Sequence, residues 1–179
     1  MEVKMLSKLN KRLLGGYVSR YHTRPEVADG QNVAAHTWGA LAILTTLWED
    51  VSREAMLYLL YHDVVESELG DLPAPTKWNY KNLDKAYSEA EAQQEEELEL
   101  PMTKARLTEQ DQHRVKMADM LELVLHCKRQ MSTGNTLATP IYQRGKQFLQ
   151  DRYGHKKDFK PVQEILNELQ LWENTLWAK

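Results

Sequence analysis

The chain of 179 residues has the length of one domain, long enough to bury a core without disulfides or metal staples. Its hydrophobic fraction of 42% and charged fraction of 27% are ordinary for a soluble globular protein. A formal net charge of −3 and the lack of a basic stripe argue against nucleic acid as an obligate partner.

The compartment is predicted from the cysteine content and from the absence of long apolar runs. Cys127 is the only cysteine, which excludes an intrachain disulfide and favours a reducing environment. The first residues lack the apolar run of a signal peptide, and no run approaches the roughly 18 residues needed to cross a bilayer. We therefore expect a cytoplasmic protein without a membrane partner.

Helical spacing of apolar residues recurs along the whole chain, whereas strand-like alternation is hard to find. Leucines between residues 6 and 14 predict a short first helix, which ends at Gly15-Gly16. Residues 17–31, rich in Arg, Pro, Asp and Gly, are expected to form a loop. Residues 33–48 are apolar almost all round and predict a central buried helix.

The remaining segments also predict helices. Ser52 can cap a helix that fades at Gly70, because the following Leu-Pro-Ala-Pro sequence cannot continue it. An acidic stretch from Leu83 to Leu100 predicts a solvated amphipathic helix. Further helices are expected over about 109–131, 139–152 and 161–177. Together these elements predict a single all-α domain over residues 1–179, built as a bundle of six or seven helices.

Two histidines and two aspartates are spread over three of these helices, as His36, then His62-Asp63, then Asp119. Imidazole nitrogen and carboxylate oxygen without thiolate suit one divalent ion such as Zn²⁺, Mn²⁺, Fe²⁺ or Co²⁺. Asp119 is the most telling residue, because an unpaired carboxylate in an apolar helix is costly. Two alternatives remain open: Asp119 could pair with a lysine or arginine, and His36 could be purely structural.

Glu66 follows His62 by four residues, so the two side chains would share one face of a continuous helix. A divalent ion bound beside them could generate hydroxide from water at neutral pH. A carboxylate one turn away would be close enough to exchange a proton with that water.

The order of these residues resembles the H…HD…D signature of the HD-domain metal-dependent phosphohydrolases. The longer string HDVVESELGDLPAPTK, from His62 to Lys77, is more specific. It resembles the HDxxE…GDLPxPxK segment of the YfbR-type 5′-deoxynucleotidases and of their phage-encoded relatives. The string NVAAHTW, from Asn32 to Trp38, similarly resembles NVAEHSW, with Ala35 and Thr37 as departures. The resemblance covers roughly residues 15–130 and implies an HD-domain helical bundle.

The resemblance also implies a ligand set and two catalytic residues. One divalent ion, Co²⁺, Zn²⁺, Mn²⁺ or Mg²⁺, would be bound by four residues: His36, His62, Asp63 and Asp119. Glu66 would be the acid/base that positions or deprotonates the attacking water. Asp71 would contact the sugar or the leaving group, although Asp71-Leu72-Pro73 could also be a simple turn that ends the helix.

Three further residues are implied to bind the substrate. Arg20 would hold a phosphate through its planar fork, and Lys77 would be a second phosphate contact. Tyr21 would lie against the sugar or the base. Better-known relatives have Trp where Tyr21 stands, so the selectivity for sugar and base stays open.

The implied function is hydrolysis of small deoxyribonucleotides. The reaction would be either removal of phosphate from a dNMP or release of triphosphate from a dNTP such as dATP. The alternatives are an HD-fold cyclic-nucleotide or alarmone phosphodiesterase, and a non-catalytic helical protein with a structural metal. A homodimer or higher homo-oligomer is expected, because the C-terminal segment with Trp172 and Trp177 has more apolar surface than one core face needs.

Overall fold

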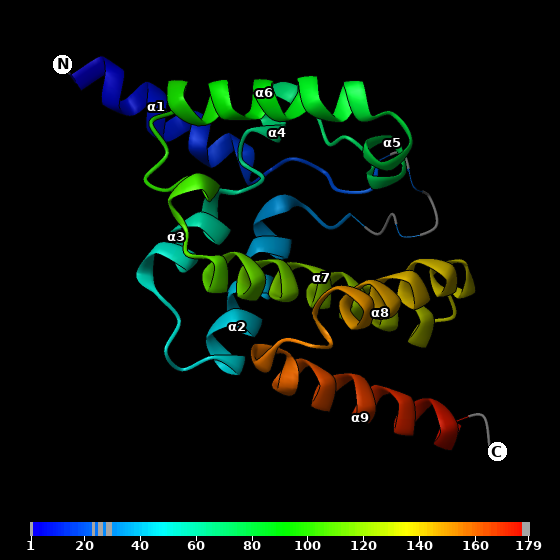
Figure 1. Ribbon diagram of the computed structural model, residues 1–179. Helices are drawn as coiled ribbons and strands as arrows, with labels where there is room; N and C mark the ends of the chain where they lie inside the picture. Colours follow the sequence, from blue (N-terminus) through cyan, green and yellow to red (C-terminus); the bar gives the residue numbers. More distant parts are fainter. Residues whose placement is uncertain (1, 23, 25–26, 28–29, 177–179) are drawn as a thin grey trace.

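The structure is a computed structural model that describes residues 2–22, 24, 27 and 30–176, with side chains for 5–22, 24, 27 and 30–171. These residues form helices and no named strand (Figure 1), which confirms the all-α prediction. A single antiparallel bridge between Ser19 and Asn32 closes the loop before the second helix. Within the described part of the chain, no helix has both the length and the apolarity to cross a membrane.

The core is built around α7 (Glu109–Ser132), which crosses the middle of the molecule (Figure 1). It packs against α8 (Thr139–Tyr153), α2 (Val33–Leu47) and α3 (Arg53–Tyr61). Their buried side chains form one hydrophobic cluster, with Leu44, Leu59, Leu121, Tyr142 and Leu149 among its members. The helix α9 (Lys160–Leu176) lies along one edge, and its Val162 and Leu166 join the same cluster.

A second group of helices lies on the opposite side of α7 from α9 (Figure 1). It consists of α1 (Glu2–Gly15), α4 (Glu66–Leu69), α5 (Ala74–Asn79) and α6 (Lys81–Glu97). A smaller cluster of buried residues, Val64, Val65, Leu98 and Leu100, joins the chain just before α4 to the chain just after α6. Gly15 allows α1 to approach this cluster, since a Cβ there would come within 2.8 Å of backbone atoms of Val64.

Side-chain caps explain where three core helices begin. The Asn32 Oδ1 atom accepts from the Ala35 amide at 2.9 Å, and Ser52 Oγ accepts from the Ala55 amide at 3.0 Å. Thr108 Oγ1 accepts from the Asp111 amide at 3.1 Å. Each cap satisfies an amide that the first helical turn leaves without a partner. The cap at Asn32 therefore sets the position of the first turns of α2.

The helix expected from Ser52 to Gly70 is interrupted. α3 ends at Tyr61, residues 62–65 form turns, and α4 then begins at Glu66. Val64 and Val65 of this turn enter the smaller cluster. His62 and Glu66 lie on either side of the break, so the prediction that they share one face of a continuous helix was wrong.

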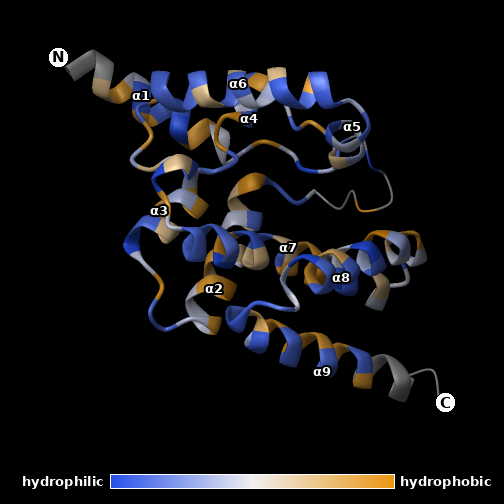
Figure 2. Cartoon of the chain, viewed as in Figure 1, coloured by the Kyte–Doolittle hydropathy of each residue, from blue (hydrophilic) through white to orange (hydrophobic). Residues whose placement is uncertain are grey.

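The other expected helices match α6, α7, α8 and α9 closely. The described residues form more helices than the six or seven predicted, because α4 is separated from α3 and because Pro73 precedes an additional short helix, α5. Short 3-10 turns complete the structure at η1 (Lys104–Arg106), η2 (Thr136–Ala138) and η3 (Lys157–Phe159). Figure 2 shows that α6 is mostly hydrophilic, in keeping with the acidic helix predicted there. Trp172 and Trp177 lie outside the side chains that the structure describes.

Candidate metal centre

Three of the predicted ligands come together at the end of α3. One nitrogen of His36, one nitrogen of His62 and one oxygen of Asp63 all lie within 4.8 Å of one another. His36 Nε2 is 3.8 Å from Asp63 Oδ2, and His62 Nε2 is 3.1 Å from Asp63 Oδ1. Because these atoms come from α2 and from the turn after α3, the packing of those elements brings the cluster together.

The fourth predicted ligand, Asp119, reaches the same cluster from α7. Its Oδ1 atom is 3.2 Å from His36 Nε2, whereas its Oδ2 atom is 2.6 Å from Lys116 Nζ. Burial by itself would raise the pKa of Asp119, but Lys116 and His36 hold that pKa well below its usual range. Asp119 therefore pairs with Lys116 and also approaches the His36 ring, although the sequence left these two arrangements as alternatives.

Both imidazole rings are oriented by a hydrogen bond at Nδ1. His36 Nδ1 is 2.8 Å from Glu122 Oε2, and His62 Nδ1 is 2.8 Å from the carbonyl oxygen of Leu59. Since both partners accept, each Nδ1 is the donor, and in a neutral ring each Nε2 then carries the lone pair. Both Nε2 atoms face Asp63, which is the arrangement that a shared cation requires.

Glu122 is a site residue that the sequence analysis missed. It is 3% exposed and accepts a hydrogen bond from Gln31 Nε2 at 3.0 Å in addition to its contact with His36. Gly39 leaves room for it, because a Cβ there would lie 3.0 Å from Glu122 Cγ. The available signal was its place three residues after Asp119, which makes it a second acid near the same face of α7.

The residues present fit a divalent cation. The fully buried Nε2 atom of His36 has no hydrogen-bond partner among the described residues, although it faces two carboxylates. Leaving such an atom unsatisfied is costly, and a bound cation would satisfy it. Burial lowers the pKa of His36, but the carboxylates of Asp119 and Glu122, which lie 3.2 and 2.8 Å from its two ring nitrogens, raise it to about 9. A proton thus supplies, in the metal-free protein, part of the positive charge that the carboxylates require.

Arg20 and Tyr21 lie beside this cluster. Arg20 Nη1 donates to Asp63 Oδ2 at 2.7 Å, and the guanidinium carbon is 5.2 Å from the centroid of the Tyr21 ring. Tyr21 has a φ of 59°, a left-handed conformation that is uncommon outside glycine, and its ring stacks on His126 at 5.5 Å. The predicted phosphate-binding arginine is therefore in direct contact with a predicted metal ligand.

The pKa of Glu66 is shifted by burial and by the charges of other predicted site residues. Burial and the charges of Asp63 and Asp71 raise its pKa to about 9, while the charges of Arg20 and Lys77 lower it. Its Oε2 atom is buried without a hydrogen-bond partner in the part of the chain that the structure describes. Glu66 is thus a protonated carboxylic acid at neutral pH in the metal-free protein.

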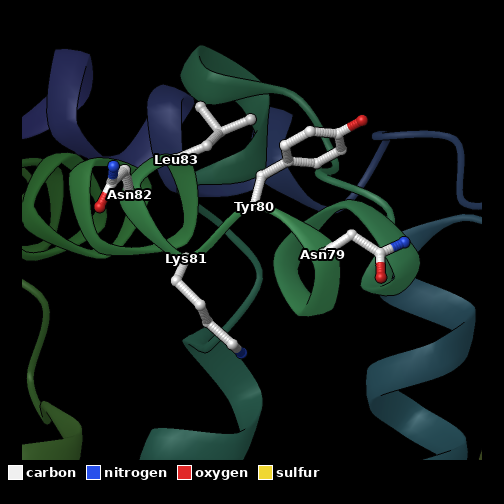
Figure 3. Close-up of a pocket in the computed structure, with 5 residues that line it drawn as sticks. All are labelled: Asn79, Tyr80, Lys81, Asn82 and Leu83. Atoms are coloured by element: carbon white, nitrogen blue, oxygen red, sulfur yellow. The ribbon is translucent and has the colours of Figure 1, made fainter.

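The ammonium group of Lys77 contacts two other side chains of the protein. Its Nζ atom is 3.5 Å from Glu91 Oε1 and 4.7 Å from the centroid of the Tyr87 ring. A hollow of ≈480 Å³ lies nearby at the junction of α5 and α6 (Figure 3), lined by Asn79, Tyr80, Lys81, Asn82 and Leu83. Tyr80 and Lys81 point to opposite sides of it, and none of the predicted site residues lines it.

Comparisons with known proteins agree on one family. The chain matches the family described as 5′-deoxynucleotidase YfbR-like over residues 6–160. It is 29% identical to the 5′-deoxynucleotidase plu3092 of Photorhabdus laumondii and 27% identical to the 5′-deoxynucleotidase yfbR of Photorhabdus temperata. Each of these alignments covers 58% of this chain and 58% of the relative. The chain therefore spans somewhat more than half the length of these curated relatives.

The fold is also similar to that of a solved structure. The crystal structure of the PH0347 protein from Pyrococcus horikoshii superposes with a TM-score of 0.69 at 19% sequence identity. The match covers 91% of this chain and 96% of the PH0347 chain. At this identity the likeness concerns the fold alone.

The raised pKa of His36 predicts that metal binding releases a proton. At pH 7 the metal-free imidazole is protonated, because its pKa of about 9 lies above the pH, and an ion at Nε2 must displace that proton. We expect about one proton released per ion at pH 7, and an affinity that rises with pH up to about 9. Calorimetric titration in two buffers with different ionisation enthalpies measures this release; identical heats in both would contradict it.

Glu122→Gln should weaken metal binding by roughly 10- to 100-fold without unfolding the protein, because the amide cannot hold the His36 ring as the carboxylate does. Glu109→Gln is the matched control, since Glu109 is exposed in the first turn of the same helix. Competition with a metal chelator gives the affinity, and thermal unfolding reports the fold. Equal affinities of the two variants would show that Glu122 does not support the site.

Proposed function

The chain belongs to the YfbR-like 5′-deoxynucleotidase family, and from that premise we propose that it hydrolyses deoxyribonucleotides at one divalent-metal site. The observation that carries this proposal is the cluster of His36, His62 and Asp63, with Asp119 beside it. The relatives named 5′-deoxynucleotidases support a monophosphate substrate in particular. A purely structural metal site would not explain a buried arginine beside a protonated glutamic acid at the same cluster.

His36, His62, Asp63 and Asp119 would hold the ion in this proposal. Nitrogen and oxygen ligands without sulfur suit Co²⁺, Zn²⁺, Mn²⁺ or Mg²⁺. When bound, such an ion acts as a Lewis acid on the phosphate and lowers the pKa of water. The rest of the chemistry belongs to the side chains around the cluster.

Glu66 is proposed to transfer the proton of the reaction. It keeps a proton at neutral pH because burial and the charges of Asp63 and Asp71 raise its pKa to about 9. Any positive charge that neutralises Asp63 lowers this pKa toward neutrality, where proton transfer in both directions is most efficient. Asp71, whose charge acts on Glu66, is proposed to contact the sugar or the leaving group.

Arg20, Tyr21 and Lys77 are proposed to bind the substrate. Arg20 has five N–H donors, and its contacts with Asp63 and with the Tyr21 hydroxyl involve only Nη1 and Nη2. The guanidinium therefore retains donors for a phosphate oxygen, and its charge is permanent. Tyr21 lies next to it and would pack against the sugar or the base. Lys77, whose charge also acts on Glu66, would contribute a second positive charge.

A substrate panel tests the proposal. The protein is assayed with dNMPs, NMPs and dNTPs in the presence of Co²⁺, Mn²⁺, Zn²⁺ or Mg²⁺, and release of phosphate, triphosphate and nucleoside is followed. We expect phosphate release from dNMPs to exceed that from NMPs. Triphosphate release from dATP would instead place the chain with the dNTP hydrolases, and hydrolysis of cyclic nucleotides would favour a phosphodiesterase. No hydrolysis with any ion would contradict the proposal.

Glu66→Gln should retain the metal and lower kcat by roughly 10²- to 10⁴-fold, because the amide cannot exchange a proton. Glu68→Gln is the control, since Glu68 lies on the same short helix with its side chain about half exposed. Metal content by elemental analysis separates the two possible roles of Glu66. Loss of the metal in the Glu66→Gln protein would make Glu66 a ligand and would move proton transfer to another residue.

We also propose that the protein forms a homodimer, and the exposed apolar face of α1 supports this proposal. Met5, Leu6, Leu9 and Leu13 of α1 are between 51% and 72% exposed, so its apolar face has no partner among the described residues. Its basic residues point to the protein instead, since Lys8 pairs with Glu99 and Arg12 Nη2 donates to the Leu98 carbonyl at 2.9 Å. An apolar patch of this kind is typical of an interaction surface.

The dimer is tested by a charge in the apolar face of α1. Leu9→Lys should convert a dimer to a monomer, because the interface would have to bury an unpaired ammonium. Leu171→Lys on α9 is the control, since Leu171 is 66% exposed and lies on the C-terminal helix that the sequence favoured. Sedimentation at micromolar concentration gives the mass. A monomeric unmodified protein would contradict the proposal, and dissociation by Leu171→Lys alone would move the interface to α9.

A further inference from the structure

One face of α6 is turned toward the candidate site, although the acidic sequence predicted a helix that is only solvated. Tyr87 and Glu91 are four residues apart and are both partly buried. Burial and the charges of Glu66, Glu91 and Asp71 raise the pKa of Tyr87 above its usual range. The Tyr87 phenol therefore lies within reach of the charges of the site and keeps its proton.

The Tyr87 hydroxyl donates a hydrogen bond to the carbonyl oxygen of Gly70. Gly70 ends α4 with a φ of 75°, a left-handed conformation, and Asp71 follows it directly. The peptide unit that Tyr87 holds is thus the one that joins Gly70 to Asp71. A hydrogen bond at this point restrains the direction in which the chain carries Asp71 away from Glu66.

The same tyrosine also contacts Lys77. The Lys77 ammonium lies 4.7 Å from the centroid of the Tyr87 ring and 3.5 Å from Glu91 Oε1. The ring attracts the cation through its π face, and the carboxylate attracts it through its charge. A lysine side chain is otherwise highly mobile, so these two contacts reduce the number of positions that its charge can occupy.

We propose that Tyr87 is a positioning residue for Asp71 and Lys77, and that Glu91 holds the Lys77 charge away from an anionic group of the substrate. The inference rests on the proposed function for the roles of Asp71 and Lys77. Tyr87 reaches both from a helix outside the main core, so α6 sets the geometry of the site without touching the reacting atoms. Glu91 competes with the substrate for Lys77 and thereby weakens substrate binding.

Tyr87→Phe removes the hydroxyl and keeps the ring under Lys77. We expect kcat/KM to fall roughly 3- to 10-fold, the usual effect of one lost hydrogen bond. Amide exchange at Leu69 and Gly70, whose amides donate to the carbonyls of Val65 and Glu66, should become faster, because release of the Gly70 carbonyl loosens the end of α4. Tyr80→Phe is the matched control, since Tyr80 is 64% exposed in the same segment, and it should change neither quantity.

Glu91→Gln removes the carboxylate that holds Lys77. We expect KM to fall roughly 2- to 5-fold with kcat nearly unchanged, in line with the small energies of partly exposed ion pairs. The decrease should be largest at low ionic strength. Glu89→Gln is the control, because it removes the same charge from an exposed position of α6 that pairs with Lys85. A KM in Glu91→Gln equal to or above that of Glu89→Gln would overturn the role of Glu91.

The exchange measurement needs no substrate, so it separates this inference from the proposed function. If the unmodified protein hydrolyses no deoxynucleotide, the proposed function fails, and exchange at Leu69 and Gly70 still decides whether Tyr87 restrains the chain at this point. If Tyr87→Phe matches Tyr80→Phe in exchange and in kcat/KM, Tyr87 is only a packing residue and the inference is wrong.

Discussion

The arrangement of this protein depends on the buried imidazole of His36, which lies between two carboxylates of α7. Glu122 holds one ring nitrogen at 2.8 Å, and Asp119 approaches the other at 3.2 Å. This contact joins α2 to α7 at a point where His36 and Glu122 are both buried and where charge is costly. A proton on His36 or a divalent cation at its Nε2 atom makes the arrangement tolerable, so the site and the core stabilise each other.

The turn at residues 62–65 is the second element on which the site depends. His62 and Asp63 lie beside His36, whereas Val64 and Val65 enter the smaller hydrophobic cluster. Interruption of the helix thus brings an aspartate and a histidine from adjacent positions to one point. It also leaves Glu66 at the start of a new helix, close to the charge of Asp63.

Positive charges around the cluster balance its excess of carboxylates. Arg20 is bound to Asp63, Lys116 to Asp119 and Lys77 to Glu91. The three cations come from different kinds of element. Lys116 comes from the same helix as its partner, one turn away, whereas Arg20 and Lys77 reach the site from a loop and from a short helix.

The sequence alone determined the helical class, the candidate ligands and their order, because these depend on residue type and on local spacing. Periodicity identifies which side chains share a face of a helix, but it does not identify what that face meets. The role of Glu122 required the contact with His36, 86 residues away, and the pairing of Arg20 with Asp63 spans 43 residues. The break after Tyr61 also became visible only in the tertiary structure, where Val64 and Val65 join a second cluster of buried residues with Leu98 and Leu100. The tertiary structure alone decided these features because each depends on packing between segments that are far apart in the chain.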